Sequence, residues 1–242
     1  QPRVDHVIIP EPLYKDAVCL GHRGVWWAEV EVKGRIAHGS MPFLGVSAIR
    51  GMGAFIEKVE RELYPRLEQR RTEMPVIPDA ARQSTLNFNS LHGGLPEQEY
   101  ADGFPSALVA DRCRIVLDRR YLIEENKEDV RDEVVALLED LQREWPEFEY
   151  ALKELWSVPP TMTAPELPLV RALNRNITRV LGVEPRHVAS PGTYDQKHVR
   201  RIGKLENCVA YGPGILELAH QPDEYIEIDD MVASAQVMAG AT

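Results

Sequence analysis

The 242-residue chain has few cysteines, no long apolar run and no excess of basic residues. Its three cysteines, Cys19, Cys113 and Cys208, are odd in number and lack the paired spacing of a zinc ribbon or a disulfide framework. This usage is typical of a reducing compartment, so we expect a cytoplasmic protein. The longest apolar stretches, such as residues 107–110, are far shorter than the roughly 20 residues that span a bilayer, and no membrane segment is expected.

The balance of charge is acidic, with a formal net charge of −10. Nucleic-acid affinity depends largely on clustered Lys and Arg, so we do not expect nucleic acid as a partner. Residues 1–6 contain neither an initiator Met nor a basic stretch followed by an apolar run, and no secretory signal is visible. Because a strand-like apolar run begins at once, at residues 7–9, we expect that the chain starts inside a fold and that an upstream portion is absent.

The central part of the chain shows a regular succession of strand and helix patterns. Alternating polar and apolar residues predict strands, and apolar residues at helical spacing predict helices. The expected order is strand 25–33, helix 45–63, strand 83–91, strand 111–120, helix 126–144 with Asn126 as N-cap, and strand 148–156. This βαββαβ order is that of the ferredoxin-like split βαβ arrangement.

The flanking segments read as α/β structure. After a proline-rich connector we expect a helix over 166–181 ending at Gly182, a helix over 196–202, a strand over 207–211 and a closing helix from about residue 229. The strand at 7–9 is expected to pair with this C-terminal part. We therefore predict that segments 1–22 and 158–242 belong to one α/β domain and that 23–157 is a module inserted into it.

Two short motifs in the first part of the chain carry residues suited to catalysis. Glu11 stands in a PEP motif just past a buried strand, where ligands bind in open α/β sheets, and its carboxylate is able to bind a divalent metal. A glutamate in a surface turn is the commoner interpretation of that motif alone. His38 lies between a strand end and a Gly/Pro loop, so we expect it to reach outward and to stabilise the oxyanion formed when water attacks an amide carbonyl.

Two further motifs lie near the C-terminus. In SPGTYD, Gly192 permits close backbone approach and Thr193 leads into a helix N-terminus, which suits an anionic group. An ordinary turn with Asp195 as N-cap is the alternative. In AHQPDEYI, His220 precedes an acidic stretch, and imidazole is the commonest zinc ligand. A surface histidine is the alternative there.

The ordered set of motifs resembles the second half of the dinuclear zinc aminoacylase and exopeptidase family, in metallopeptidase clan MH. The motifs are PEP, G-x-x-x-HGSMP, LDRR, PGTYD and YGPG-x-x-x-x-AHQPDEYI, and they cover essentially the whole chain. That family includes acetylornithine deacetylases, succinyl-diaminopimelate desuccinylases, carboxypeptidase G-type enzymes and aminoacylases. The resemblance implies part of a zinc-exopeptidase-like α/β domain with an inserted ferredoxin-like βαββαβ dimerisation (lid) domain.

The resemblance also implies roles for individual residues. Glu11 and His220 correspond to metal ligands, one for each of two zinc ions, with cobalt or manganese as substitutes. His38 corresponds to the histidine that, in homodimeric members, reaches the partner's active site and polarises the scissile carbonyl. The substrate is expected to be held by three residues: Arg120, whose guanidinium suits a carboxylate, with Gly192 and Thr193 lining the pocket.

The chain also departs from the family pattern. The family's His-x-Asp motif is absent, and the one Glu-Glu pair, Glu124-Glu125, is expected to cap and solvate rather than to catalyse. A two-metal site needs about five or six protein ligands, and this chain offers two. The leading hypothesis is a metal-dependent hydrolase of amide bonds in N-acyl amino acids or small peptides, represented without its N-terminal metal-binding half. The alternative is a non-catalytic dimerisation or ligand-binding module.

Overall fold

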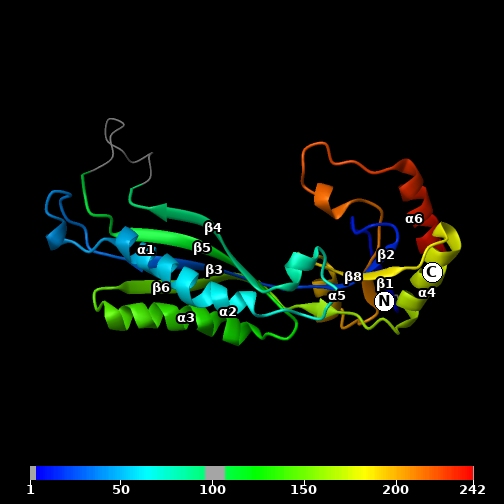
Figure 1. Cartoon of the computed structure of the whole chain (residues 1–242), viewed down its shortest axis with the longest axis horizontal. Helices are drawn as coiled ribbons and strands as arrows, with labels where there is room; N and C mark the ends of the chain where they lie inside the picture. The colour runs from blue at the N-terminus through cyan, green and yellow to red at the C-terminus, as the bar shows by residue number, and fades with distance from the viewer. Residues whose placement is uncertain (1–3, 96–106, 242) are drawn as a thin grey trace. The chain divides into compact units, whose positions relative to one another are not determined.

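The structure is a computed structural model that describes residues 4–95 and 107–241. The chain divides into two compact units (Figure 1). Unit 1 comprises Gln1–Gly24, Thr72–Arg82 and Val158–Thr242, and unit 2 comprises Val25–Arg71 and Gln83–Ser157. The sequence analysis placed residues 72–82 in the central segment, whereas in the structure Val76 forms a bridge with Ala189 of unit 1.

Unit 1 is built on a five-stranded mixed sheet with the path β1-β9-β2-β7, in which β8 also pairs with β2. Helices α4 and α6 pack against each other and share one apolar cluster with β2 and β9. The elements are β1 (Val7–Ile9), β2 (Ala17–His22), β7 (Thr161–Met162), α4 (Pro168–Leu181), β8 (Arg186–Ser190), α5 (Gln196–Arg201), β9 (Cys208–Ala210) and α6 (Ile228–Ala241). Two short 3-10 turns, Asp79–Arg82 and Leu216–Leu218, complete the unit.

The two faces of this sheet are both covered. Val18 and Leu20 of β2 pack into the cluster with α4 and α6, and Ala17 and Cys19 pack into a second cluster on the other face that includes Tyr194. All six residues of β2 are buried, so this strand lacks the polar and apolar alternation that would have predicted it. The sequence-based expectations include neither β2 nor β7 nor β8: β2 lacks alternation, β7 has only two residues, and β8 is buried over its last three residues without alternation.

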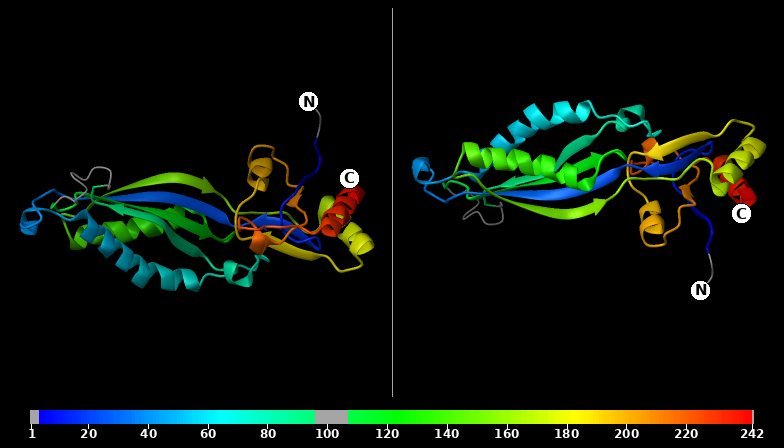
Figure 2. Two further views of the ribbon diagram at one scale, coloured as in Figure 1. Left: turned by 90° about the horizontal axis from the view of Figure 1, so that it is seen from above. Right: turned by 90° about the horizontal axis from the view of Figure 1, so that it is seen from below.

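Unit 2 is a four-stranded sheet of order β4-β5-β3-β6 with its helices on one face (Figure 2). Its elements are β3 (Gly24–Lys33), a 3-10 turn (Pro42–Leu44), α1 (Ala48–Lys58), a π-helical turn (Val59–Leu63), α2 (Tyr64–Glu68), β4 (Thr85–Gly93), β5 (Arg112–Tyr121), α3 (Lys127–Glu144) and β6 (Glu149–Val158). The six predicted elements are confirmed, except that the first helical region extends beyond residue 63 as α2.

The alternation read from the sequence accounts for the core of unit 2. Trp26, Ala28 and Val30 point from β3 into one apolar cluster, which α1 and α3 complete from the other side. The side chain of Asn126 caps α3 by accepting a hydrogen bond from the backbone N–H of Asp129 at 2.8 Å, as predicted. Within the described residues, no helix of either unit is long and apolar enough to cross a membrane.

A buried ion-pair network lies within unit 2 where β5 ends. The fully buried Arg119 donates to Glu125 at 2.7 Å and to Ser84 at 2.8 Å, and Arg70 donates to the same Glu125 at 2.9 Å. Burial acts to raise the pKa of Glu125, but the charge of Arg119 and several hydrogen bonds outweigh it and lower that pKa. Glu125 accepts a hydrogen bond from the backbone N–H of Leu122 at 2.7 Å, and beyond this local role its carboxylate compensates a buried arginine.

Glu125→Gln should destabilise unit 2 markedly. The change leaves Arg119 with less compensation for its buried charge, and breaking a buried pair costs about 3 kcal/mol or more. Thermal or urea unfolding followed by circular dichroism measures the effect. Glu139→Gln, on the exposed side of α3, is the control and should change stability by less than about 0.5 kcal/mol. Equal stability of the two variants would contradict a structural role for the network.

Candidate functional site

Parallel pairing of β1 with β9 brings two loops together at one edge of the unit 1 sheet. Ile8 pairs with Val209, and the backbone N–H of Tyr211 donates to the carbonyl of Ile9 at 3.0 Å. Each strand then runs directly into a loop, so Glu11 lies beside the loop that begins at Tyr211. A Cβ at Gly212 would lie 2.7 Å from the backbone oxygen of Glu11, so the close approach of the loops requires glycine at that position.

The second of these loops leads to His220. Gly214 has φ of +117°, which only glycine adopts readily, and its carbonyl accepts from the backbone N–H of Tyr14 at 3.0 Å. The 3-10 turn Leu216–Leu218 follows, and His220 is exposed in a left-handed conformation with φ of +64°. Its backbone N–H donates to the Glu224 carboxylate at 3.3 Å, while its ring makes no hydrogen bond within the described residues.

Glu11 is half-buried and sits in a mixed electrostatic environment. Burial raises the pKa of its carboxyl group, and the negative charge of Asp195 raises it further, while Lys197 and His220 act in the opposite direction. Within residues 4–95 and 107–241 the Glu11 carboxylate makes no hydrogen bond or ion pair. A partly desolvated carboxylate without a partner is a favourable site for a cation.

The donor chemistry at this edge fits a divalent transition metal, but the number of donors is small. Glu11 offers carboxylate oxygens and His220 an imidazole, and these are two of the ligand types that zinc prefers. A group of three or more His, Cys, Asp or Glu side chains that could hold a metal ion is not found in the described part of the chain. Asp195 and Lys197 act on Glu11 only in the folded chain, and the sequence motif predicts Asp195 only as a helix cap.

The SPGTYD loop is held by buried polar side chains. The amide nitrogen of Gln196 donates to the carbonyl of Leu20 at 3.0 Å and to that of Cys208 at 2.8 Å, and its amide oxygen accepts from the Tyr194 hydroxyl at 2.7 Å. These bonds fix the start of α5 against the sheet. The Gly192 N–H donates to the Ser190 hydroxyl at 3.2 Å, and Asp195 occupies the N-cap position without a side-chain cap bond. The Asp195 carboxylate instead forms an ion pair with Lys197 at 3.7 Å.

His22 is a buried histidine that the sequence analysis did not single out. Its ring lies edge-on to Tyr194, with centroids 5.2 Å apart, and its Nδ1 lies 2.8 Å from the Arg23 carbonyl oxygen. Its Nε2 is buried without a hydrogen-bond partner. Burial, reinforced by the charge of Lys197, lowers the pKa of His22 to about 4, and its ring is therefore neutral at pH 7.

In unit 2, His38 is exposed on a loop that pairs with Leu108. The backbone N–H of Ser40 donates to His38 Nδ1 at 3.2 Å, and the Ser40 hydroxyl lies 2.8 Å from the same nitrogen. Because Nδ1 accepts a hydrogen bond from a backbone N–H, the proton of the neutral ring lies on Nε2. The exposed ring therefore has an Nε2–H that is available as a donor.

Arg120 lies near the end of β5 and is partly exposed. Its guanidinium donates to both carboxylate oxygens of Asp118, at 2.6 and 2.9 Å. An arginine has five N–H donors, so this fork uses two and leaves Nη1 and one hydrogen of Nη2 for another ligand. Asp118 fixes the orientation of the group and reduces its net charge, which the sequence analysis did not consider.

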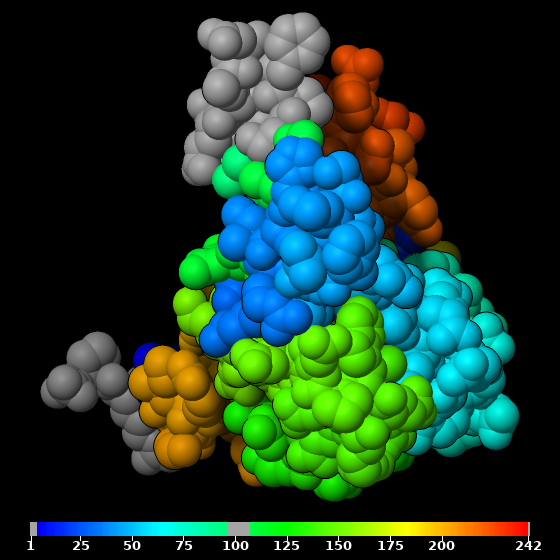
Figure 3. Space-filling view, turned by 90° about the vertical axis from the view of Figure 1, so that its left-hand side faces the viewer, coloured from blue at the N-terminus to red at the C-terminus, as the bar shows by residue number. Residues whose placement is uncertain are grey.

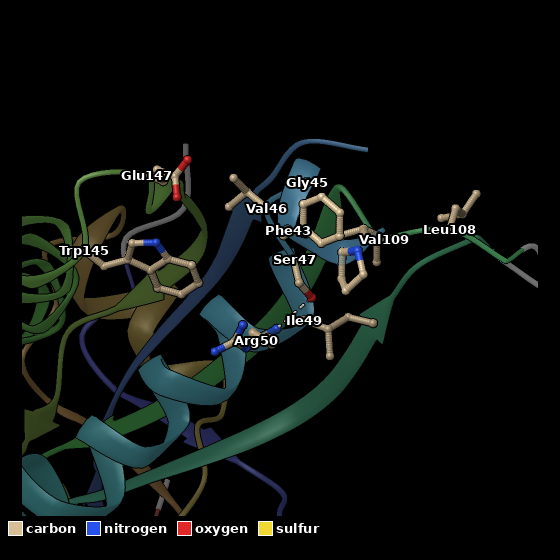
Figure 4. A pocket seen from close by; sticks show the side chains of 12 residues that line it. Phe43, Gly45, Val46, Ser47, Ile49, Arg50, Leu108, Val109, Trp145 and Glu147 are labelled. Atoms are coloured by element: carbon tan, nitrogen blue, oxygen red, sulfur yellow. Dashed lines mark hydrogen bonds between the residues drawn. The ribbon is translucent and has the colours of Figure 1, made fainter. Parts of the chain in front are cut away.

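A surface cavity of about 580 Å³ lies beside the His38 loop in unit 2 (Figure 4). Phe43, Ile49 and Trp145 supply apolar lining, and Arg50 and Glu147 supply charged groups. The loop of residues 36–49, drawn in blue, forms part of the face in Figure 3. Phe43 in this loop is 79% exposed. Other large apolar side chains of this loop are also exposed, namely Ile36, Met41, Leu44 and Ile49.

Comparisons with known proteins agree with one family. A family model described as a peptidase dimerisation domain matches residues 20–146. Acetylornithine deacetylase from Myxococcus xanthus is 27% identical over 239 residues, covering 99% of this chain and 57% of that protein. An M20 family metallo-carboxypeptidase from Sulfolobus solfataricus has a TM-score of 0.71 at 18% identity, covering 99% of this chain and 63% of that chain. The di-peptidase Dug1p from Saccharomyces cerevisiae has a TM-score of 0.72 at 13% identity, covering 98% and 58%.

The similar proteins share the fold of this chain, and the chain covers only part of their length. The shared fold is a mixed α/β fold that includes a dimerisation domain. The chain spans a little over half the length of the Myxococcus relative, 57%. The predicted resemblance to metal-dependent amidohydrolases and exopeptidases is confirmed at the level of the family.

Unit 1 should lose stability in mild acid because of His22. Its pKa is about 4 in the folded chain and near 6.5 when exposed, so the unfolded chain binds more protons between these values. Above pH 6.5 His22 is neutral in the folded and the unfolded chain, and the free energy of unfolding is not reduced by it. As the pH drops towards 4, protonation of His22 in the unfolded chain lowers the free energy of unfolding by up to about 3 kcal/mol. Urea unfolding at pH 7 and pH 5 should show a smaller difference in His22→Gln. An unchanged pH dependence in that variant would show that His22 titrates normally.

Proposed function

Because the chain belongs to the M20 peptidase dimerisation domain family, we propose that it is part of a metal-dependent hydrolase of amide bonds in N-acyl amino acids or small peptides. The observation that carries this proposal is that His220 acts electrostatically on the half-buried Glu11 in unit 1, and that neither side chain makes a hydrogen bond within the described residues. The names of the relatives support the reaction class, since they include a deacetylase, a dipeptidase and a metallo-carboxypeptidase.

The two units take different parts in this proposal. Unit 1 is the C-terminal part of a catalytic α/β domain, and unit 2 is a ferredoxin-like dimerisation (lid) domain. The βαββαβ order of unit 2 and its sheet order β4-β5-β3-β6 support the second assignment. The segments predicted from the sequence, 1–22, 23–157 and 158–242, are retained with the addition of residues 72–82 to unit 1.

Glu11 and His220 are the proposed metal ligands of this chain, one for each of two zinc ions, with cobalt or manganese as alternatives. When bound, such ions lower the pKa of a coordinated water towards 7 and polarise a carbonyl oxygen. The half-buried carboxylate of Glu11 supports this role, since a metal would replace the hydration that burial removes. The other ligands would come from residues outside the described part of the chain.

His38 is the proposed oxyanion donor. Its Nε2–H would donate to the carbonyl oxygen as negative charge develops there, a contribution of about 100- to 1,000-fold in kcat for such donors. The two contacts from Ser40 to Nδ1 support the role, because they hold the ring in the donor tautomer. We propose that it acts in the active site of a homodimeric partner.

Arg120, Gly192 and Thr193 are the proposed substrate-binding residues. The free Nη1 edge of Arg120 suits the α-carboxylate of an amino acid or peptide, and Asp118 holds that edge in place. Gly192 offers close backbone approach because only the Ser190 hydroxyl lies within 4 Å of a Cβ built there, at 3.8 Å. Thr193 stands next to it, ahead of α5.

The proposed homodimer forms through unit 2. The exposed apolar side chains of the loop 36–49, together with the cavity beside them, support an interface on this unit, since monomeric proteins rarely leave such groups together in water. We also propose a reducing, cytoplasmic environment. The three buried cysteines are free, and burial raises the pKa of Cys19 and of Cys208 to about 11, which protects both thiols from oxidation.

A second candidate function is a non-catalytic dimerisation or ligand-binding module derived from the family. The observation that favours it is the small donor set, since the described residues hold no group of three metal-ligating side chains. The two proposals differ in metal content and in activity, so one measurement on the full-length protein separates them.

Glu11→Ala and His220→Ala should each abolish tight zinc binding by the full-length protein. Each removes a direct ligand, so the loss should exceed the roughly 10- to 100-fold that outer-shell partners contribute. Zinc affinity by chelator competition, together with hydrolysis of N-acetyl amino acids and dipeptides, measures the effect. Glu184→Ala and His198→Ala alter exposed residues of unit 1 and are the matched controls. A full-length protein without zinc or amidase activity would favour the non-catalytic module.

His38→Ala should lower kcat about 100-fold or more without changing zinc content, because the ring donates to the reacting carbonyl rather than to the metal. Co-expression of His38→Ala with Glu11→Ala tests the position of the residue. If His38 acts across a dimer, activity should recover to roughly a quarter of wild type, since half of randomly mixed dimers are heterodimers and each has one complete site. No recovery would place His38 in the active site of its own chain, or outside the mechanism.

A further inference from the structure

The two proposed metal ligands of this chain are carried by loops, and the structure contains a side-chain link between those loops. Tyr14 follows Glu11 by three residues, and Glu217 precedes His220 by three residues. The Tyr14 hydroxyl donates to the Glu217 carboxylate at 2.5 Å. The backbone N–H of Tyr14 also donates to the Gly214 carbonyl at 3.0 Å, so backbone and side chain of one residue both contact the loop that leads to His220.

Tyr14 is held in an unusual conformation by its surroundings. Its φ of +71° lies in the left-handed region, which costs a residue with a Cβ about 1 to 2 kcal/mol. The Arg186 guanidinium lies over its ring, 5.2 Å from the centroid, and is itself fixed by two hydrogen bonds to Asp16 at 2.7 and 2.8 Å. Such strain persists only where neighbouring contacts determine the conformation, and it is concentrated at functional sites.

The backbone between Glu217 and His220 is held by successive hydrogen bonds, so the positions of these two residues depend on each other. The N–H of Leu218 donates to Ile215 at 3.0 Å, that of Ala219 to Leu216 at 3.2 Å, and that of Gln221 to Leu218 at 3.0 Å. These successive turns leave little freedom over residues 215–221. A displacement of Glu217 would therefore displace His220.

The hydrogen bond between the two side chains keeps its polarity over a wide pH range. Burial, the hydrogen bond to Glu217 and the charge of that carboxylate together raise the pKa of Tyr14 to about 12. The same hydrogen bond lowers the pKa of Glu217. The hydroxyl is thus a donor and the carboxylate a charged acceptor at neutral pH, which is a stronger pairing than one between neutral groups.

We propose that Tyr14 is a positioning residue for metal binding, because its hydroxyl bond to Glu217 holds the Glu11 and His220 loops at a fixed separation. This inference rests on the proposed function, in which Glu11 and His220 are ligands. Tyr14 contacts neither metal nor substrate in this proposal. It acts through the two loops that it connects.

The test is zinc affinity of the full-length protein, measured by chelator competition. Tyr14→Phe keeps the ring beneath Arg186 and removes only the hydroxyl, and it should weaken zinc binding about tenfold, the lower end of the effect of outer-shell partners. Glu217→Ala should have the same effect, and the double variant should lose no more than either alone, since both changes break one bond. Glu217→Gln keeps an acceptor and should restore part of the affinity.

The control is a variant of a second tyrosine, and hydrogen exchange of the metal-free protein is the second measurement. Tyr150→Phe removes the hydroxyl of a tyrosine in β6 of unit 2 and should leave zinc affinity unchanged. In metal-free Tyr14→Phe, the amides of residues 216–221 should exchange with deuterium faster than in Tyr150→Phe. Zinc binding that requires Glu11 and His220 but is the same in Tyr14→Phe would overturn this inference alone. Zinc binding that does not require those two residues would overturn the proposed function and this inference with it.

Discussion

The parallel pairing of β1 with β9 is the constraint on which unit 1 depends. Parallel strands end at the same edge of a sheet, so the register of Ile9 opposite Ala210 places both following loops side by side. That proximity forces glycine at position 212, where any side chain would collide with the backbone of Glu11. A shift of β1 by one residue would turn its side chains to the opposite face and carry Glu11 away from the loop that leads to His220. The candidate site is therefore a consequence of strand register.

Both units bury polar side chains, and in most cases each group has a partner. Gln196 in unit 1 and Arg119 in unit 2 are buried, and each makes several hydrogen bonds, including one from Gln196 to the Leu20 carbonyl and one from Arg119 to Ser84. Such networks stabilise only the arrangement in which every bond is made, so they favour one packing over alternatives of similar apolar burial. Some buried polar atoms have no hydrogen-bond partner within the described residues, among them Arg119 Nε and one atom each of His22 and Thr161, which are paired residues of β2 and β7. Two such atoms on neighbouring strands suit an ordered water between them.

The elements and site residues that could be predicted are those whose residue pattern is visible within a short segment of the sequence. The βαββαβ order of unit 2 was predictable because its strands have one buried face, so Trp26, Ala28 and Val30 alternate with partly exposed residues. Strand β2 was not predictable, because a strand covered on both faces has no alternation. The same distinction holds at the candidate site. Glu11 and His220 stand in recognisable motifs, whereas the action of Lys197 on Glu11 and the bond of Tyr14 to Glu217 depend on contacts that only the folded chain creates.

The electrostatics of Glu11 explain why this edge of the sheet suits a metal more than an organic cation. The carboxylate is half-buried beside Asp195, so two negative charges lie near each other and burial raises the pKa of Glu11. Lys197 and His220 offset this only in part, since the net direction of the shift remains upward. A divalent ion would supply a larger compensating charge than a monovalent organic cation. The exposed imidazole of His220, which makes no side-chain hydrogen bond within the described residues, is a softer donor than a carboxylate.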